Sequence, residues 1–140
     1  MKVLVPVDGS SASERAVRHV IDLVKGKAQF EVHLINVQET ADAWEVQRFL
    51  KPAEIKRTQL EHGAQCLAGA KRLLDRAGVS YETHIAIGDP AEKITQIAQR
   101  RKIDKIFMGT HGRAAIAGLL MGSVSTRVLH LAKVPVTLVK

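Results

Sequence analysis

Short apolar runs alternate along the chain with segments in which apolar residues recur every three or four positions. The first run, Lys2 to Val7, stops at the polar turn Asp8-Gly9-Ser10, which is typical of a buried strand meeting a turn. Ser11-Ala12-Ser13-Glu14 has the Ser-x-x-Glu spacing of a capping box and predicts a helix start. The helix is predicted to end near Gly26, and its buried face comprises Ala16, Val17, Val20, Ile21 and Val24.

The same alternation continues to the end of the chain. Further strands are predicted over Phe30 to Val37, Tyr81 to Ile87, Asp104 to Met108 and Pro135 to Val139. Between them, helices are predicted from about Glu54 to Gly78, after Gly88, and after Gly122, and the stretch from Gln38 to Ala53 is predicted as a loop with partial helix. The second of these helices has the clearest start, with Asp89 as its cap, Pro90 in its first position and Glu92 in the reciprocal capping position.

Five strands that alternate with about four helices imply parallel pairing through right-handed crossovers. The apolar runs of the first, fourth and fifth strands suit strands that are covered on both faces. The pattern therefore predicts one doubly wound α/β domain over residues 1–140, with a five-stranded parallel sheet and helices on both faces, a Rossmann-like fold.

Composition places this domain among ordinary globular proteins, with 140 residues, 46% hydrophobic and 25% charged. The single cysteine, Cys66, has no partner for a disulfide in the chain, which favours a reducing, cytoplasmic setting. The first apolar run turns polar at Asp8, too early for a signal-peptide core or a membrane-spanning helix, so we expect no membrane association.

The formal charge of +7 favours phosphate-rich partners, from ATP to nucleic acid. The basic residues are spread over several predicted helices, and only 4% of the residues are aromatic. Solvated helix faces account for such a spread, and base stacking would be poorly supplied. We therefore do not expect nucleic acid as a partner, and a small phosphate-bearing ligand fits better.

Two polar turns follow predicted strands at their carboxyl ends, where open parallel sheets bind ligands. They are Asp8-Gly9-Ser10, after the first strand, and Gly109-Thr110-His111-Gly112, after the fourth. After nine intervening residues, Gly122-Ser123-Val124 opens the last helix, whose unpaired amides and dipole favour a phosphate. Arg113 is placed to close over a phosphate oxygen. The spacing predicts a phosphate cradle that is neither a P-loop nor a dinucleotide fingerprint.

Each part of the cradle also has a purely structural interpretation. The glycines would form turns, Ser123 would cap a helix, and Asp8 would complete an Asp-Gly-Ser turn. His111 is interpreted as a polar lining residue and not as a base, because it has no evident carboxylate partner. We assign no catalytic residue.

Histidines outside the cradle suggest no metal site. His62 and Cys66 are four residues apart on a predicted helix, but no third or fourth ligand is evident nearby. His33 and His84 are predicted as partly exposed polar positions on strands.

These residues together resemble the universal stress protein family, over essentially the whole chain. The matching segments are Val5-Pro6-Val7-Asp8-Gly9-Ser10, Leu34-Ile35-Asn36-Val37, Gly88-Asp89-Pro90, Met108-Gly109-Thr110-His111-Gly112-Arg113, Leu120-Met121-Gly122-Ser123-Val124 and Val134-Pro135-Val136. The glycine spacing is similar to that of the family's ATP-binding branch.

The resemblance implies ATP held between the ends of the first and fourth strands. Asp8 and Val37 would border the adenine and ribose, while the glycine segments would hold the sugar and phosphates. A divalent metal, Mg²⁺, would be bound mainly through the nucleotide phosphates, and the protein would dimerise through its last strand, Pro135 to Val139. The expected nucleotide-binding residues are Pro6, Val7, Asp8, Val37, Met108, Gly109, His111, Gly112, Arg113, Gly122, Ser123 and Val124.

The sequence therefore predicts an ATP-binding stress-response or regulatory module that acts as a dimer. Two alternatives stay open: a slow ATP hydrolase, and a nucleic-acid-binding stress protein that uses the basic surface. The absence of a Walker-type lysine and of paired carboxylates near the cradle weakens the enzyme hypothesis without excluding it, because phosphoryl transfer depends chiefly on positioning and charge.

Overall fold

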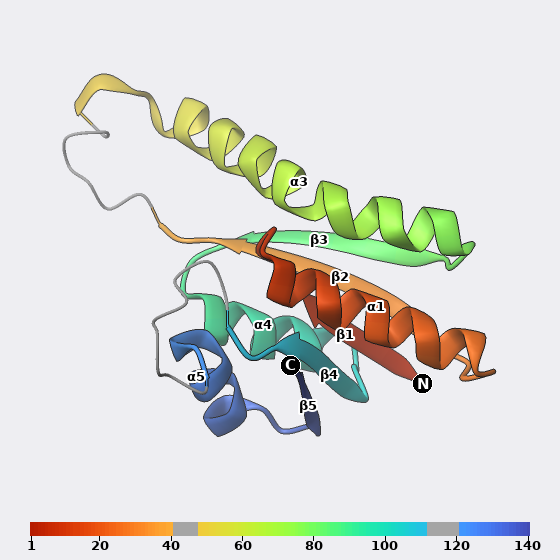
Figure 1. The fold of residues 1–140 in the computed structure, drawn as a ribbon. Coiled ribbons are helices and arrows are strands. Elements are labelled where there is room, and N and C mark those ends of the chain that lie inside the picture. Colours follow the sequence, from red (N-terminus) through yellow and green to blue (C-terminus); the bar gives the residue numbers. More distant parts are fainter. Residues whose placement is uncertain (41–47, 112–120) are drawn as a thin grey trace.

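The computed structural model describes residues 1–40, 48–111 and 121–140, and its helices and strands follow the predicted order (Figure 1). The elements are β1 (Lys2–Pro6), α1 (Ser11–Lys25), β2 (Glu31–Gln38), α3 (Pro52–Ala77), β3 (Tyr81–Ile87), α4 (Pro90–Arg100), β4 (Lys105–Gly109), α5 (Ser123–Leu131) and β5 (Val136–Val139). Residues 41–47, within the predicted loop from Gln38 to Ala53, lie outside the described part. Pro52, which has no N–H to leave unpaired, occupies the first position of α3, so this helix starts two residues before the predicted Glu54.

All five strands are parallel, in the order β3-β2-β1-β4-β5. This arrangement confirms the predicted doubly wound sheet. The chain moves outward from β1 to β2 and β3, and then crosses back to place β4 on the other side of β1. The strand order therefore reverses between β1 and β4, which is where ligands bind in folds of this type.

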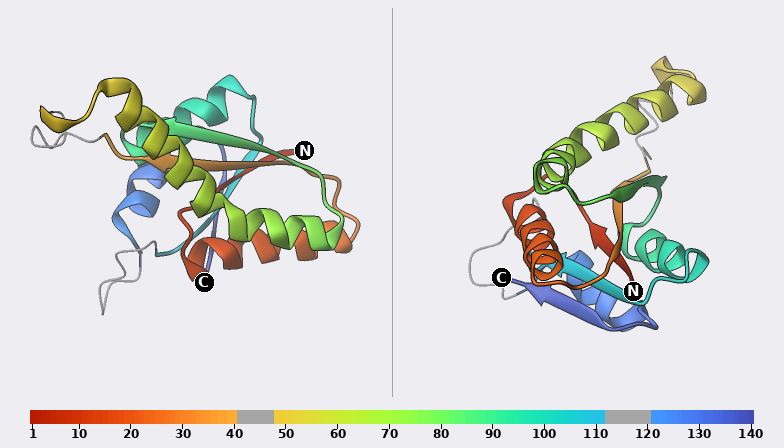
Figure 2. Two further views of the ribbon diagram at one scale, coloured as in Figure 1. Left: turned by 90° about the horizontal axis from the view of Figure 1, so that it is seen from above. Right: turned by 90° about the vertical axis from the view of Figure 1, so that its right-hand side faces the viewer.

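Helices cover both faces of the sheet, α1 and α3 on one side and α4 and α5 on the other (Figure 2). Alternate residues of β1 serve the two faces, because successive side chains of a strand point in opposite directions. Val3 and Val5 pack with Val17 of α1, whereas Leu4 packs with Ile94 of α4. The continuous apolar run of β1 thus reflects a strand buried on both sides.

The predicted capping box at the start of α1 is wrong by one residue. The capping residue is Ser10, not Ser11, because Ser10 has the extended backbone of a cap (φ −76°, ψ 159°) while Ser11 is already helical. The Ser10 hydroxyl accepts a hydrogen bond from the Ser13 amide at 3.2 Å. Glu14, the expected reciprocal partner, instead pairs with Arg18 one turn along the helix, at 3.3 Å.

The start of α4 is capped as predicted and also tied to α5. Asp89 accepts a hydrogen bond from the Glu92 amide at 3.0 Å, and its second carboxylate oxygen pairs with the guanidinium of Arg127. The Glu92 amide, with further help from Arg127, lowers the pKa of Asp89 below its ordinary value of 3.8. The carboxylate charge therefore stabilises the folded chain at neutral pH.

We expect Asp89→Asn to lower the thermal midpoint at neutral pH, and the difference from the wild type to close in acid. Asparagine caps a helix about as well as aspartate, so the variant loses mainly the charge. Because the folded-state pKa is the lower one, the stabilisation is present above pH 3.8 and is lost as the pH falls through the folded-state pKa. Thermal unfolding across this range measures it, with Asp22→Asn at an exposed position of α1 as the control. A difference that does not change with pH would contradict this account.

His33 of β2 is not the partly exposed residue that the sequence predicts. Its side chain is only 2% exposed and faces the α4 side of the sheet. The prediction failed because alternation along β2 marks Val32 and Leu34 as buried and leaves the intervening positions to solvent. In the structure both faces of β2 are covered, and His84, which is partly buried as predicted, lies against His33.

Among the described helices, none is both long and apolar enough to cross a lipid bilayer.

Candidate functional site

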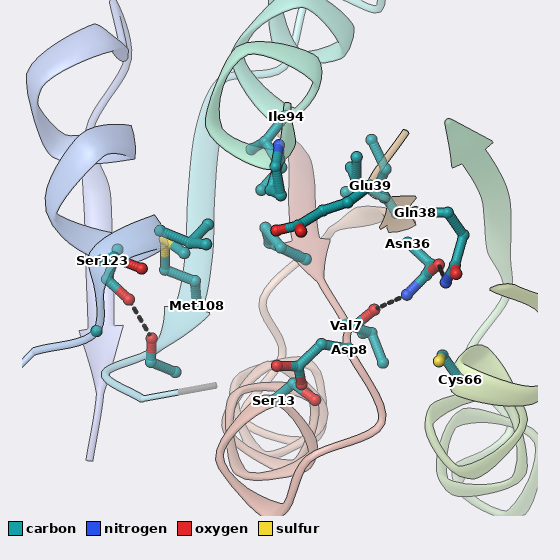
Figure 3. Close-up of a pocket in the computed structure, with 18 of the residues that line it drawn as sticks. Val7, Asp8, Ser13, Asn36, Gln38, Glu39, Cys66, Ile94, Met108 and Ser123 are labelled. Carbon is teal, nitrogen blue, oxygen red and sulfur yellow. Dashed lines mark hydrogen bonds between the residues drawn. The ribbon is translucent and has the colours of Figure 1, made fainter. Parts of the chain in front are cut away.

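A cavity of about 460 Å³ opens at the carboxyl ends of β1, β2 and β4, at the point where the strand order reverses (Figure 3). Its volume lies within the usual range for small-molecule sites, about 300–1,000 Å³. The walls come from the ends of these strands, from the starts of α4 and α5, and from one face of α3. Segments distant in the sequence therefore meet around one space.

The first wall is the turn between β1 and α1. The Asp8 carboxylate accepts a hydrogen bond from the Ser10 amide at 2.9 Å, which closes an Asx turn. Gly9 has a φ of +83°, a conformation that side chains other than hydrogen rarely tolerate. The turn directs Asp8 and Ser13 toward the cavity, so Asp8 both completes the turn and lines the cavity.

The second wall is the end of β2, held by a chain of polar side chains. The buried amide of Asn36 donates a hydrogen bond to the Val7 carbonyl at 2.8 Å and accepts one from Gln38 at 2.7 Å. The side-chain oxygen Oε1 of Gln38 in turn lies 2.9 Å from the Nδ1 atom of His62 on α3. This chain joins the ends of β1 and β2 to α3 and fixes the backbone beside Val37.

The third wall runs from the end of β4 to the start of α5. The Ser125 hydroxyl donates to the Gly109 carbonyl at 3.0 Å, and the Gly122 amide donates to the Thr110 carbonyl at 2.6 Å. These bonds hold the first turn of α5 against the end of β4. Gly122 is the capping residue of α5 and carries no side chain that can accept from the helix amides.

The three helices that begin beside the cavity differ in their caps. A serine hydroxyl caps α1 and an aspartate carboxylate caps α4. Within the described residues, no side chain caps α5, although its first turn lines the cavity with Ser123, Val124 and Ser125. Amides in a first helical turn need an acceptor, and the helix dipole favours a negatively charged one.

The charged side chains that line the described part of the cavity are acidic. Asp8 and Glu39 point into the space between Met108 and Asn36 (Figure 3). Neither lysine nor arginine is among the lining residues in ranges 1–40, 48–111 and 121–140. Within these ranges, the start of α5 is the favourable position for an anionic group of a ligand. The carboxylates are acceptors for hydroxyl groups of a ligand.

The structure brings together every expected site residue that it describes. Ten of the twelve line the one cavity: Pro6, Val7, Asp8, Val37, Met108, Gly109, His111, Gly122, Ser123 and Val124. Gly112 and Arg113 lie outside the described residues. A ring nitrogen of His111 lies 3.1 Å from the Thr110 hydroxyl. The sequence separations between these segments are long, so their convergence comes from the strand order.

Several further residues line the cavity but were not predicted from the sequence. They are Ser13, Ile35, Asn36, Gln38, Glu39, His62, Cys66, Pro90, Ile94 and Ser125. Asn36 and Gln38 were within reach of prediction, because polar residues at the end of an otherwise apolar strand mark the functional edge of the sheet. His62 and Cys66 both line the cavity, but Cys66 is buried, and the pair is not among the groups of described residues that are arranged to hold a metal ion.

The universal stress protein family model matches residues 1–140 of the chain. A universal stress protein of Methanocaldococcus jannaschii, MJ0531, is 32% identical over 147 aligned residues, which cover 99% of this chain and 81% of that protein.

Solved structures share the fold. The structure of protein MJ0577, also from M. jannaschii, has a TM-score of 0.85 and 32% identity and covers 99% of this chain and 94% of its own. A universal stress family protein of Arabidopsis thaliana, solved with AMP bound, has a TM-score of 0.70 and 21% identity and covers 100% of this chain and 91% of its own.

Proposed function

The chain belongs to the universal stress protein family, and from this premise we propose that it is an ATP-binding regulatory module that acts as a dimer. The observation that carries the proposal is the start of α5, which opens on the cavity without a side-chain cap among the described residues. A ligand phosphate would supply the acceptor that serine supplies to α1 and aspartate to α4.

The phosphates would lie at Gly122, Ser123 and Val124. Backbone amides of the first helical turn, together with the Ser123 hydroxyl, would donate hydrogen bonds to them. Such charge-assisted bonds contribute about 1.5–3 kcal/mol each, so a few suffice for micromolar binding after the cost of association. Mg²⁺, carried by the nucleotide, would offset the negative charge of the phosphates beside the Asp8 and Glu39 carboxylates.

The nucleoside would lie at the opposite side of the cavity, against the ends of β1 and β2. Val37 and Ile35 provide apolar contacts for a base, and the Asp8 carboxylate provides an acceptor for a ribose or adenine donor. The Asn36–Gln38–His62 chain keeps this wall in place before a ligand arrives. The AMP bound to the Arabidopsis relative supports the choice of an adenine nucleotide.

The geometry favours binding over hydrolysis. His111 is the only histidine after β4 that lines the described part of the cavity, and one of its ring nitrogens already lies against the Thr110 hydroxyl. A general base must reach the proton it abstracts, and the described residues that line the cavity at the start of α5, Gly122 to Ser125, include neither a histidine nor a carboxylate. We therefore infer that the protein holds ATP and releases it largely unchanged.

The dimer would form through β5. This strand lies at the edge of the sheet, no strand of the described residues pairs with its outer side, and three of its four residues are apolar. Edge strands of this kind need a cover. We expect sedimentation velocity to give twice the chain mass of 15.3 kDa, and a species of the single-chain mass at all concentrations would contradict the proposed dimer.

The proposal is tested by denaturing the purified protein and identifying any released nucleotide by chromatography. We expect an adenine nucleotide, or, if the protein is isolated empty, saturable binding of added ATP with Mg²⁺. Phosphate release measured over hours then separates a binder from a hydrolase. A protein that releases no nucleotide and does not bind ATP at millimolar concentration would overturn the proposal.

A further inference from the structure

Two Glu-x-His sequences lie on neighbouring strands in the structure, Glu31-Val32-His33 on β2 and Glu82-Thr83-His84 on β3. The parallel register places His33 opposite Glu82, with His84 two residues further along. Because side chains two apart point to the same face of a strand, these residues share the face of the sheet that α4 covers. The nucleotide cavity, by contrast, takes its β2 lining from Ile35 onward, toward the carboxyl end.

Three potential metal-ligand atoms converge in this group. The Nδ1 atom of His33 lies 3.0 Å from Nε2 of His84 and 3.7 Å from a carboxylate oxygen of Glu82. All three atoms lie within 4.8 Å of one another. Zinc binds imidazole nitrogens and carboxylate oxygens at about 2.0–2.2 Å, so ligand atoms around one tetrahedral ion stand about 3.4 Å apart. The observed separations bracket this value, so modest side-chain adjustments would admit an ion.

Glu31 orients His33 from the other side of its ring. The Nε2 atom of His33 lies 3.1 Å from the Glu31 carboxylate, an acceptor that favours the proton on Nε2 and leaves Nδ1 with its lone pair. Metal-binding histidines characteristically direct their second nitrogen to a carboxylate in this way. The Glu31 carboxylate is itself held by Lys2 at 3.6 Å. His33, buried to 98%, is therefore presented to its neighbours in one orientation.

The group is open to an ion from one side. The Glu82 side chain is 56% exposed and His84 is partly buried, so an ion would enter past them and meet His33 at the bottom. Arg101 lies close enough to His84 for its positive charge to act on this ring. Arg101 also repels a cation, so it sets an upper limit on the affinity.

We propose that His33, Glu82 and His84 form a binding site for a divalent transition metal such as Zn²⁺, with Glu31 as the residue that positions His33. Two imidazoles and one carboxylate are a donor set that suits Zn²⁺. Three protein ligands leave a fourth position to water on the exposed side. The site is independent of nucleotide, because its ligands lie outside the cavity described above.

Equilibrium dialysis of the untagged, nucleotide-free protein against Zn²⁺ tests the proposal, and the visible spectrum of bound Co²⁺ reports the coordination geometry. We expect one Zn²⁺ per chain with micromolar affinity. His84→Gln and Glu82→Gln should each weaken binding by at least about tenfold, and Glu31→Gln by about 10–100-fold, as for other residues that orient a ligating histidine. His130→Gln, at an exposed position of α5, is the control and should change nothing.

Arg101→Gln should strengthen Zn²⁺ binding, whereas the variants of the ligand residues should weaken it. Removing its positive charge should tighten Zn²⁺ binding severalfold if the ion lies beside His84, and should have no effect on an ion held elsewhere. Circular dichroism of each variant checks the fold. If the wild type binds no Zn²⁺ at micromolar concentration, or if binding survives in His84→Gln, the proposal is wrong and the two histidines serve only as a hydrogen-bonded pair.

Discussion

Gly122→Val should abolish ATP binding and leave the fold intact. The backbone of Gly122 (φ −75°, ψ 164°) is extended and negative in φ, a conformation that valine adopts readily. The added methyl groups would stand where the account places the phosphates, at the first turn of α5. The loss of two charge-assisted hydrogen bonds of about 1.5–3 kcal/mol each corresponds to an affinity lower by at least about 100-fold.

Lys51→Val is the matched control for this variant. Lys51 is the capping residue of α3, and the substitution places the same side chain at a helix start that is not among the residues lining the cavity. Isothermal titration with ATP and Mg²⁺ should show wild-type affinity for Lys51→Val and none for Gly122→Val, with matching circular dichroism spectra. Tight binding by a folded Gly122→Val protein would show that the phosphates do not lie at the start of α5.

Gly109→Ala should destabilise the protein even when no nucleotide is present. A Cβ atom at this position would lie 2.7 Å from both the carbonyl carbon and the carbonyl oxygen of Ala12, on the first turn of α1. Backbone atoms inside a packed core cannot move aside cheaply, and overpacking of this kind costs about 1–3 kcal/mol. The free energy of unfolding in urea, measured on nucleotide-free protein, should fall by that amount.

Gly26→Ala is the control for the general effect of a methyl group on glycine. Gly26 ends α1 with a φ of −75°, and a Cβ there would meet its nearest atoms at an ordinary 3.4 Å. Alanine should therefore leave the urea midpoint nearly unchanged or raise it slightly, because it also restricts the unfolded chain. If Gly109→Ala proves as stable as Gly26→Ala, the glycine at the end of β4 is not required by packing.

Gly109 and Gly122 are present for different reasons, although the sequence pattern predicts one reason for both. The pattern from Gly109 to Ser123 predicts one phosphate cradle in which each glycine serves the ligand. In the structure, Gly109 is required because α1 approaches the end of β4, whereas Gly122 has neither positive φ nor a role as a side-chain cap. A close approach between two elements and a contact with a ligand can both require glycine, so the sequence alone does not distinguish them.

The sheet could be predicted because the apolar residues of each strand mark that strand in the sequence. Apolar runs that end in Asp8 and in Gly109 mark the carboxyl ends of β1 and β4, and the strand order brings these ends together. The strand and helix starts were predicted to within one or two residues, with Ser10 in place of Ser11 as the clearest correction. Local caps and turns are encoded locally, so their errors are small.

The remaining parts of the site depend on contacts that no local pattern encodes. Asn36 is buried because Val7 and Gln38 supply its partners, and Cys66 reaches the cavity because α3 packs across the end of β2. His33 was predicted to be partly exposed because two of its partners, Glu82 and His84, reach it only through the pairing of β2 with β3. The burial and the partners of a polar residue inside a sheet can be predicted only when the pairing register of its strand is known.

The central claim, that ATP binds in this cavity with its phosphates at the start of α5, is tested most directly by amide NMR. ATP with Mg²⁺ is added to ¹⁵N-labelled protein, and the shifts of assigned backbone amides are followed. We expect saturable chemical-shift changes at the amides of Ser123 and Val124, with further changes at Asp8 and Val37. The chemical shifts of the β3 amides near Glu82 should not change. Saturable binding that leaves Ser123 and Val124 unshifted would contradict the central claim.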